Sequence, residues 1–199
     1  KKRKTIIIKP AINDAFSDQG YAFAEINPLT YDSLDVVNVE INISLNKKVY
    51  INRIIISGNT RTQDEVIRRE IGVSEGGLYS RSALRNSVIK LRRLGYFSDV
   101  QMTASEIENT PDKINLSFKV DETKTGAISF SLSHSNNYGI SIGAGIQEKN
   151  IFGSGNTLNS EIKLSDSFNK VSFYFENPYF NDKNHNISYG AFVSNIKDD

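Results

Sequence analysis

The chain lacks cysteine and tryptophan, holds two histidines and one methionine, and has no long apolar run. Without cysteine it can form neither a disulfide framework nor a thiolate metal site. The histidines, His134 and His185, stand far apart and offer no cluster of ligands, so neither a metal nor another cofactor is expected. No apolar stretch approaches the roughly 20 residues of a transmembrane helix. Any residence in a membrane must therefore be by strands or by attachment to the surface.

The charges of the chain and its short motifs exclude further classes of function. The sequence has 24 lysines and arginines against 23 aspartates and glutamates, a net charge of +1, so nothing indicates a nucleic-acid partner. Gly153-Ser154-Gly155 lacks the lysine of a phosphate loop and the spacing of a dinucleotide fingerprint. The Gly-x-Ser-x-Gly elbow of hydrolases does not occur. The chain is therefore not predicted to be an enzyme.

Residues 126 to 195 alternate apolar and polar side chains in segments of about ten residues, separated by turn residues. Successive strand residues point to opposite faces, so each segment is expected to present one apolar and one polar face. The predicted apolar surface includes Ile142, Ile162, Phe173 and Tyr189, and the predicted polar surface includes Ser141, Lys163, Ser172 and Ser188. This alternation is typical of a transmembrane β-barrel. A soluble antiparallel sheet gives the same pattern, so the pattern alone does not separate the two.

The preceding part of the chain contains a repeat. Gly20-Tyr21 and Gly95-Tyr96 stand about 75 residues apart, and each pair follows a helical stretch and precedes two strands. The second copy can be followed throughout: a strand over residues 50–57, a helix from a capping box of Thr62 and Glu65 to about Gly72, a helix capped by Ser80, and two strands that turn near Pro111-Asp112. This β-α-α-β-β order predicts an α+β sandwich, with two helices on one face of a small sheet.

Two sets of motifs carry a resemblance to a known family. The first set resembles a polypeptide-transport-associated (POTRA) domain: Ile54-Ile55-Ile56-Ser57-Gly58-Asn59-Thr60, Arg68-Arg69-Glu70 and Leu94-Gly95-Tyr96-Phe97. The second set resembles the first two periplasmic turns of the barrel in the BamA family of outer-membrane protein assembly factors: Asn150-Ile151-Phe152-Gly153-Ser154-Gly155-Asn156 and Asn177-Pro178-Tyr179-Phe180. In that family, several POTRA domains precede a sixteen-stranded barrel.

The resemblance implies that the chain is a fragment with three parts. Residues 1–46 are expected to be the C-terminal part of a POTRA domain, residues 47–122 a complete POTRA domain that is the last before the barrel, and residues 123–199 the N-terminal strands, about five, of an antiparallel transmembrane β-barrel. The POTRA domains are expected in the periplasm and the barrel in the outer membrane of a Gram-negative bacterium. Residues 121–126 contain no apolar residue. They are predicted to form a short extended connector with little packing of its own.

The resemblance also implies a function that needs neither nucleotide nor metal. POTRA domains are expected to receive unfolded client barrels, and the barrel seam to template their folding and insertion into the outer membrane. The implied partners are unfolded outer-membrane proteins, the lipoproteins of an assembly complex and outer-membrane lipid. Three alternatives stay open: a two-partner secretion or translocation-assembly pore of the same superfamily, a soluble periplasmic POTRA scaffold, and a fused hydrolase.

Three groups of residues are the predicted sites. In the seam strand, which is expected to pair with the last barrel strand, they are Ile128, Ser129, Phe130, Ser131, Leu132 and Ser133. An edge strand over residues 100–106 is expected to bind a client peptide as an added strand through Val100, Gln101, Met102 and Thr103; a capped, inert edge is the alternative. Arg68, Arg69 and Glu70, partly solvent-facing on a short helix, are the predicted dock for a partner lipoprotein, and a merely solvated face is the alternative.

Overall fold

The computed structural model describes residues 2–33, 36–136, 139–182 and 185–196. The chain divides into two compact units: unit 1 holds Lys1–Gly58, Glu70–Arg93 and Asp99–Val120, and unit 2 holds Asn59–Arg69, Leu94–Ser98 and Asp121–Asp199. The three-part division of the chain at residues 46 and 122 rests on sequence pattern and stays a prediction. Within the described ranges, no helix combines the length and the apolar character needed to cross a membrane.

The N-terminal part of unit 1 is a helix followed by a two-stranded sheet. Helix α1 spans Lys2–Ser17 and thus takes in the Ile6-Ile7-Ile8 run ahead of Pro10. Strands β1 (Glu25–Ser33) and β2 (Val36–Ser44) pair antiparallel along their whole length. A helix that leads into an antiparallel strand pair is the second half of the β-α-α-β-β order, as the sequence repeat predicts.

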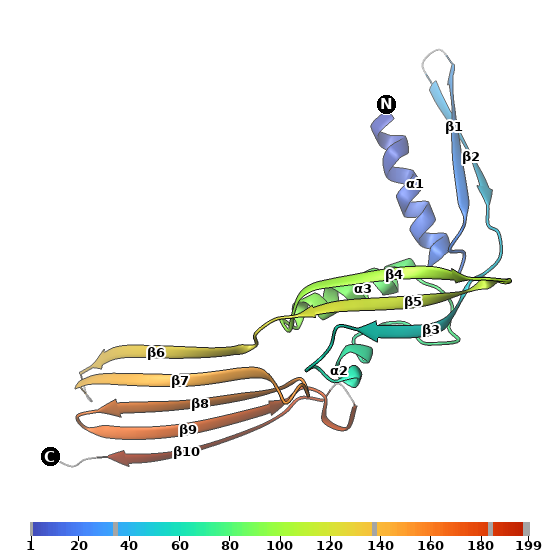
Figure 1. Ribbon diagram of the computed structural model, residues 1–199. Helices are drawn as coiled ribbons and strands as arrows, with labels where there is room; N and C mark the ends of the chain where they lie inside the picture. Colours follow the sequence, from blue (N-terminus) through green and yellow to red (C-terminus); the bar gives the residue numbers. More distant parts are fainter. Residues whose placement is uncertain (1, 34–35, 137–138, 183–184, 197–199) are drawn as a thin grey trace. The chain divides into compact units, whose positions relative to one another are not determined.

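A three-stranded sheet belongs to the second copy of the repeat. Strands β3 (Tyr50–Ser57), β4 (Phe97–Ile107) and β5 (Thr110–Glu122) lie in the order β3-β5-β4, with β3 parallel to β5 (Figure 1). The turn between β4 and β5 falls at Glu108 and Asn109, so the prediction of a turn near Pro111-Asp112 is wrong. Asn109 adopts the positive φ of 62° that a tight turn requires. Pro111 lies at the start of β5, where the missing backbone donor is tolerated.

Helix α3 (Arg81–Arg93) supplies helical side chains to the core of unit 1. It begins as predicted, because the hydroxyl of Ser80 accepts a hydrogen bond from the amide of Ala83 at 3.2 Å. The buried positions of this helix are Leu84, Ser87 and Leu91. The serine is tolerated in the core because its hydroxyl accepts a hydrogen bond from the Gly72 amide at 2.8 Å and donates one to the Ala83 carbonyl at 2.7 Å. Strand residues complete this core: Ile51, Ile54, Val100, Ile114, Leu116, Phe118 and Val120.

Helix α2 (Asp64–Arg68) belongs to unit 2 and is five residues long. The prediction that it starts at a capping box of Thr62 and Glu65 and runs to about Gly72 is wrong. Its N-cap residue is Gln63, which gives no side-chain capping bond. The Thr62 hydroxyl instead accepts a hydrogen bond from Asn150 Nδ2 at 2.9 Å. A helix this short gains little from its own hydrogen bonds, so its place depends on contacts with the rest of unit 2.

The larger part of unit 2 is an antiparallel five-stranded sheet. Its strands are β6 (Gly126–Ser135), β7 (Gly139–Ile151), β8 (Asn156–Ser165), β9 (Phe168–Asn177) and β10 (Ile187–Ile196), each paired with the next in sequence (Figure 1). A short 3₁₀ helix, η1 (Phe180–Asp182), lies between β9 and β10. The strands predicted from the alternation are thereby confirmed. In the outer loop predicted at residues 136–138, Asn137 and Tyr138 lie outside the described residues.

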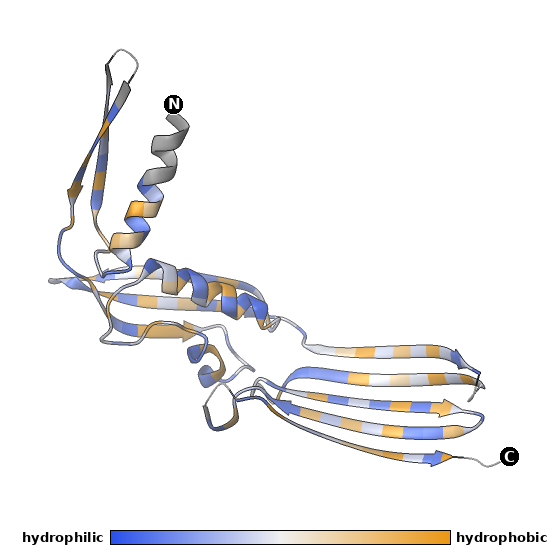
Figure 2. Ribbon diagram, turned by 180° about the vertical axis from the view of Figure 1, so that it is seen from behind, coloured by the Kyte–Doolittle hydropathy of each residue, from blue (hydrophilic) through white to orange (hydrophobic). Residues whose placement is uncertain are grey.

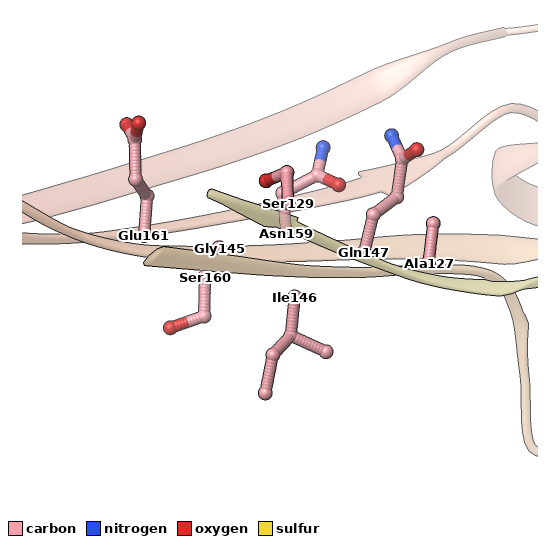
Figure 3. A pocket seen from close by; sticks show the side chains of 8 residues that line it. All are labelled: Ala127, Ser129, Gly145, Ile146, Gln147, Asn159, Ser160 and Glu161. Carbon is pink, nitrogen blue, oxygen red and sulfur yellow. The ribbon is translucent and has the colours of Figure 1, made fainter. Parts of the chain in front are cut away.

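The pairing register decides which side chains share a face of this sheet, because residues directly opposite one another point to the same side. On the first face, Ile142 lies opposite Leu164, Ile162 opposite Ala144, Phe173 opposite Ser160, and Tyr189 opposite Phe175. On the second face, Ser141 lies opposite Ser165, Lys163 opposite Gly143, Ser172 opposite Glu161, and Ser188 opposite Glu176. Figure 3 shows Ser129, Asn159 and Glu161 projecting from one side of the strands and Ile146 from the other. The predicted two-sidedness is confirmed.

The apolar face of the five-stranded sheet is open. Ile128, Phe130 and Leu132 are 70%, 83% and 77% exposed. Hydrophobic bands recur along the strands of this sheet (Figure 2). A soluble sandwich covers such a face with a second sheet, whereas an open apolar surface of this extent is typical of contact with lipid or with another protein. The face therefore agrees with the lipid-facing side of a barrel wall.

Two adjacent residues of β9 test this assignment. Phe173→Arg, on the apolar face, is expected to destabilise the inserted protein by roughly 2–4 kcal/mol, and Ser172→Arg, on the polar face, by much less. In outer membranes, a cysteine at position 173 should react with a lipid-soluble maleimide and a cysteine at 172 with a water-soluble one. The reverse labelling, or a protein in which neither reagent reaches position 173, would contradict a lipid-facing sheet.

A second substitution tests the core of unit 1. Phe118 of β5 is fully buried, and Ile55 of the neighbouring strand β3 is 44% exposed. Phe118→Ala should lower the free energy of unfolding by about 3–5 kcal/mol through lost burial and a residual cavity. Ile55→Ala should lower it by less than about 1 kcal/mol. The measurement is the denaturant dependence of amide exchange in β3 and β5, and equal losses in the two variants would contradict the assigned core.

Candidate functional site

The predicted seam strand β6 is an edge of the five-stranded sheet, with β7 as its neighbour among the described residues. Every residue of β6 is exposed. Its apolar face carries Ile128, Phe130 and Leu132, and its polar face carries Ser129, Ser131 and Ser133. Gly145 and Gly143 of β7 lie opposite Ser129 and Ser131, so little side-chain volume stands on the polar face. The six residues predicted from the sequence thus lie together on one accessible strand.

The predicted client-binding strand β4 is also an edge, in the sheet order β3-β5-β4. Val100 is buried, Met102 is half-buried, and Gln101 and Thr103 are exposed. Both backbone groups of Val100 already have partners. Its amide donates to Asp99 Oδ1 at 2.8 Å, and its carbonyl accepts a hydrogen bond from Arg92 at 3.0 Å. At Val100 the edge is therefore capped by side chains, and an added strand would have to pair beyond it.

Arg68, Arg69 and Glu70 do not form one exposed charged patch. Arg68 is exposed and makes an ion pair with Asp64 at 3.2 Å. The guanidinium of Arg69 lies over the ring of Tyr179, 4.0 Å from its centroid. Glu70 is 6% exposed. Of the three predicted docking residues, only Arg68 is exposed.

A cluster of hydrogen bonds in unit 2 surrounds Glu122, which the sequence predicts to lie in a connector with little packing. Its carboxylate accepts hydrogen bonds from the amides of Thr60, Arg61 and Thr62 at 3.1, 3.0 and 2.6 Å, and from the Thr60 hydroxyl at 2.8 Å. Burial disfavours the charged carboxylate, but the hydrogen bonds from Thr62, Thr60 and Arg61 outweigh it and lower the pKa of Glu122 to about 2. Glu122 is therefore ionised at any physiological pH.

A second contact involves Thr125, which lies three residues after Glu122 and directly before β6. The side chain of Thr125, 7% exposed, lies between the guanidinium of Arg61 and the carboxylate of Glu148 and is hydrogen-bonded to both. Arg61 and Glu148 also make an ion pair at 3.3 Å. Residues 121 and 122 belong to β5 and residue 126 to β6, and residues 123–125 form neither helix nor strand. The prediction that the connector has little packing is wrong, because Thr125 is buried. We call Glu122, Thr125, Arg61 and Glu148 the polar junction.

The turn between β7 and β8 completes the surroundings of the junction. The amide of Gln63 donates to the carbonyl of Gly153 at 2.9 Å. Asn150, 1% exposed, donates to Thr62 Oγ1 and accepts a hydrogen bond from the Gly155 amide at 2.7 Å. Gly153 has a φ of +71°, and a Cβ atom there would overlap the carbonyl of Arg61. Glycine is therefore required for the turn to approach residues 61–63 this closely.

The sequence held two signals for this cluster. The connector has five polar residues before Gly126, and such a run has either a solvated or a hydrogen-bonded environment. Gly153-Ser154-Gly155, part of a predicted periplasmic turn, has glycines that permit a close backbone approach. The partners at residues 60–63 could not be read from either signal. In the described part of the chain, no group of three or more His, Cys, Asp or Glu side chains could hold a metal ion.

Removal of the charge on Glu122 tests the first contact of the polar junction. Glu122→Gln should weaken it by about 1–3 kcal/mol, because a neutral amide accepts more weakly and brings a donor toward three amides. In the unmodified protein, the contribution of Glu122 should be complete above about pH 4.5 and should fall as the pH drops toward 2, since the folded-state pKa lies below the ordinary one.

The readout is the protection of the amides of residues 60–62 against hydrogen exchange, corrected for the intrinsic rate at each pH. Asp121→Asn is the matched control, because Asp121 is an exposed neighbour in the same strand. Equal protection in the Glu122→Gln and Asp121→Asn variants would show that the carboxylate does not hold the 60–62 amides.

Comparison with known proteins identifies the family. The family model described as "POTRA: Surface antigen variable number repeat" matches residues 49–123. The chain is 34% identical over 187 residues to the outer membrane protein assembly factor BamA of Nitratidesulfovibrio vulgaris, covering 92% of this chain and 23% of that protein. It is 32% identical over 183 residues to BamA of Neisseria meningitidis serogroup B, covering 91% of this chain and 23% of that protein. The chain therefore spans about a quarter of the length of these curated relatives.

Solved structures agree with these sequence matches. The crystal structure of BamA from Haemophilus ducreyi lacking POTRA domains 1–3 superposes with a TM-score of 0.91 at 26% identity, covering 98% of this chain and 37% of that one. CdiB from Acinetobacter baumannii shares the fold, with a TM-score of 0.54 at 17% identity over 94% of this chain and 35% of that one. The chain has a POTRA domain, which is periplasmic, followed by the first antiparallel strands of an outer-membrane β-barrel. It therefore belongs to the BamA family.

Proposed function

We propose that the protein to which this chain belongs assembles β-barrel proteins into the outer membrane. The POTRA part receives unfolded clients in the periplasm, and β6 templates their folding at the barrel seam. The observation that carries this proposal is the polar face of β6, where Ser129 and Ser131 lie opposite glycines, on a strand that pairs with β7 alone among the described residues. The names of the relatives, outer membrane protein assembly factors, support the same function.

The driving force for templating is the hydrogen bonding of the strand edge. Backbone donors and acceptors that lack partners are expensive in hydrocarbon, because no water is present to satisfy them. An incoming strand satisfies the edge through main-chain hydrogen bonds, which place little demand on the sequence of the client. The process therefore needs no nucleotide or metal, since it lowers the barrier to a pairing that is itself favourable.

The side chains of β6 suit repeated pairing and release. Ser129 and Ser131 face Gly145 and Gly143, so the polar face offers little interlock between side chains. On the apolar face, Ile128, Phe130 and Leu132 keep the strand in contact with lipid whichever partner it has. Strand exchange then changes main-chain hydrogen bonds and leaves lipid contacts nearly constant.

For the reception of clients and the docking of lipoproteins, we assign fewer residues than the sequence predicts. An added client strand on β4 pairs along Gln101, Met102 and Thr103, because the backbone of Val100 is already hydrogen-bonded to Asp99 and Arg92. For the lipoprotein dock, Arg68 offers the exposed charge. Arg69 and the buried Glu70 support the local structure behind it.

Site-specific cross-linking in the full-length protein tests the templating role. A cysteine at Ser131 in β6 should form disulfides with a cysteine in a terminal strand of a client during assembly. A cysteine at Ser172, on the same face but in the interior strand β9, is the matched control and should form few. A client that assembles normally without any adduct at position 131 would contradict templating by β6.

The same experiment separates the alternative of a secretion pore of the same superfamily. In a secretion pore the passenger moves through the lumen, so cysteines at positions 131 and 172 should both cross-link to a soluble exported polypeptide. Adducts of that kind would replace assembly by export as the function.

A further inference from the structure

We infer that Arg61 is a positioning residue for the seam strand: through Thr125 and Glu148 it sets the register in which β6 enters the sheet. Its contacts lie within unit 2 and meet at the first residue pair of the β6–β7 ladder, Gly126 opposite Glu148. The effect of this positioning on clients rests on the proposed function, whereas the positioning itself does not.

The connector is held at three of four successive positions. The Glu122 carboxylate is bonded to the amides of residues 60–62. The amide of Thr123 donates to the carbonyl of Tyr96 at 2.9 Å. The Thr125 hydroxyl is bonded to Arg61 and Glu148. The chain thus reaches Gly126 with its place along the strand direction already defined.

Register matters more for β6 than for an interior strand. Side chains alternate with a period of two, so the alternation opposes a slip of one residue, which would exchange the lipid-facing Phe130 for a serine. A slip of two residues keeps both faces of β6 on their sides, so the alternation does not oppose it. Interior strands are held in register by two neighbours, whereas β6 has β7 alone among the described residues. Serine opposite glycine gives little side-chain resistance to sliding. An anchor at the start of the strand supplies the register that its own side chains do not.

The exposure of the pair favours positioning over stabilisation. The side chains of Arg61 and Glu148 are 47% and 29% exposed, and an ion pair this open to solvent contributes little to overall stability. Thr125 between them is buried and is hydrogen-bonded to both side chains. Loss of Arg61 should therefore change where β6 pairs more than how stably the protein folds.

Engineered disulfides between β6 and β7 report the register directly in the full-length protein in membranes. Ser133 and Ser141 lie opposite one another with their hydroxyl oxygens 2.6 Å apart, so Ser133→Cys with Ser141→Cys reports the native register. Ser131→Cys with Ser141→Cys reports a slip by two residues. Arg61→Glu should raise the ratio of slipped to native disulfide by roughly five- to tenfold, and Arg61→Lys, which keeps the charge, should raise it less.

Combining Arg61→Glu with Glu148→Arg should return the ratio toward that of the unmodified protein. The return should be partial, because Glu148 also accepts a hydrogen bond from the amide of Asn150. Lys124→Glu is the matched control, since Lys124 is an exposed basic residue next to Thr125, and it should leave the ratio unchanged. Only the membrane-inserted fraction is scored, and Arg61→Gln replaces Arg61→Glu if the latter does not insert.

An unchanged ratio in Arg61→Glu and Arg61→Gln, or an equal change in Lys124→Glu, would overturn the inference. If the ratio fails to change while Ser131 still cross-links to clients, the proposed function stands without the positioning role. If the ratio changes but clients never cross-link at Ser131, Arg61 positions the strand and the proposed function falls. Where both hold, single charge reversal should slow client assembly and the exchanged pair should recover part of the rate.

Discussion

The carboxylate of Glu122 accepts hydrogen bonds from the backbone amides of Thr60, Arg61 and Thr62, and the arrangement of unit 2 near the start of β6 depends on this contact. The three amides precede a helix of five residues, which is too short to hold its own position. Glu122 in turn is the last residue of β5 and lies four residues before β6. The ionised side chain of Glu122 therefore links the residues that precede α2 to the segment that precedes the first barrel strand.

The contact made by Glu122 lies between a strand whose apolar residues are buried in protein and a strand whose apolar residues are open. The residues before it belong to β5, in which Ile114, Leu116, Phe118 and Val120 are buried in protein. The residues after it belong to β6, in which Ile128, Phe130 and Leu132 are open on an apolar face. Polar backbone near a membrane boundary must be satisfied by protein or by water. The polar junction meets that requirement with two carboxylates, one hydroxyl and one guanidinium. These groups bond to one another or to neighbouring amides.

The two strand edges predicted as binding sites differ in state. At β4, the backbone of Val100 is occupied by Asp99 and Arg92, a device that protects sheet edges from unwanted pairing. At β6, the edge away from β7 is the one proposed to exchange partners, and its surroundings are expected to be lipid, where backbone groups without partners are less favourable than in water. Strand addition at β6 consequently has the larger driving force. The proposed templating role of β6 and the proposed receiving role of β4 agree with this physical difference.

Local patterns in the sequence determined much of this structure. The alternation over residues 126 to 195 determined the strands and their two faces, because the side-chain period of a strand is a property of its own backbone. Ser80 was predictable as a helix cap for the same reason, since its partner, Ala83, is three residues away. The seam residues on β6 and the edge position of β4 followed from such patterns together with the family resemblance.

Tertiary structure alone decided the polar junction. Thr62 looks like a helix cap in sequence, yet its hydroxyl bonds to Asn150, which is 88 positions away. Glu122 bonds to Thr60 and Thr62, which precede it by 62 and 60 positions. Glu70 lies in a charged triplet but is buried, and Thr125 is buried within a wholly polar connector. Periodicity tells which way a side chain points from its own strand or helix. It does not tell which distant segment the fold will bring there, and for hydrogen-bonding side chains that partner decides whether they are solvated, buried or part of a site.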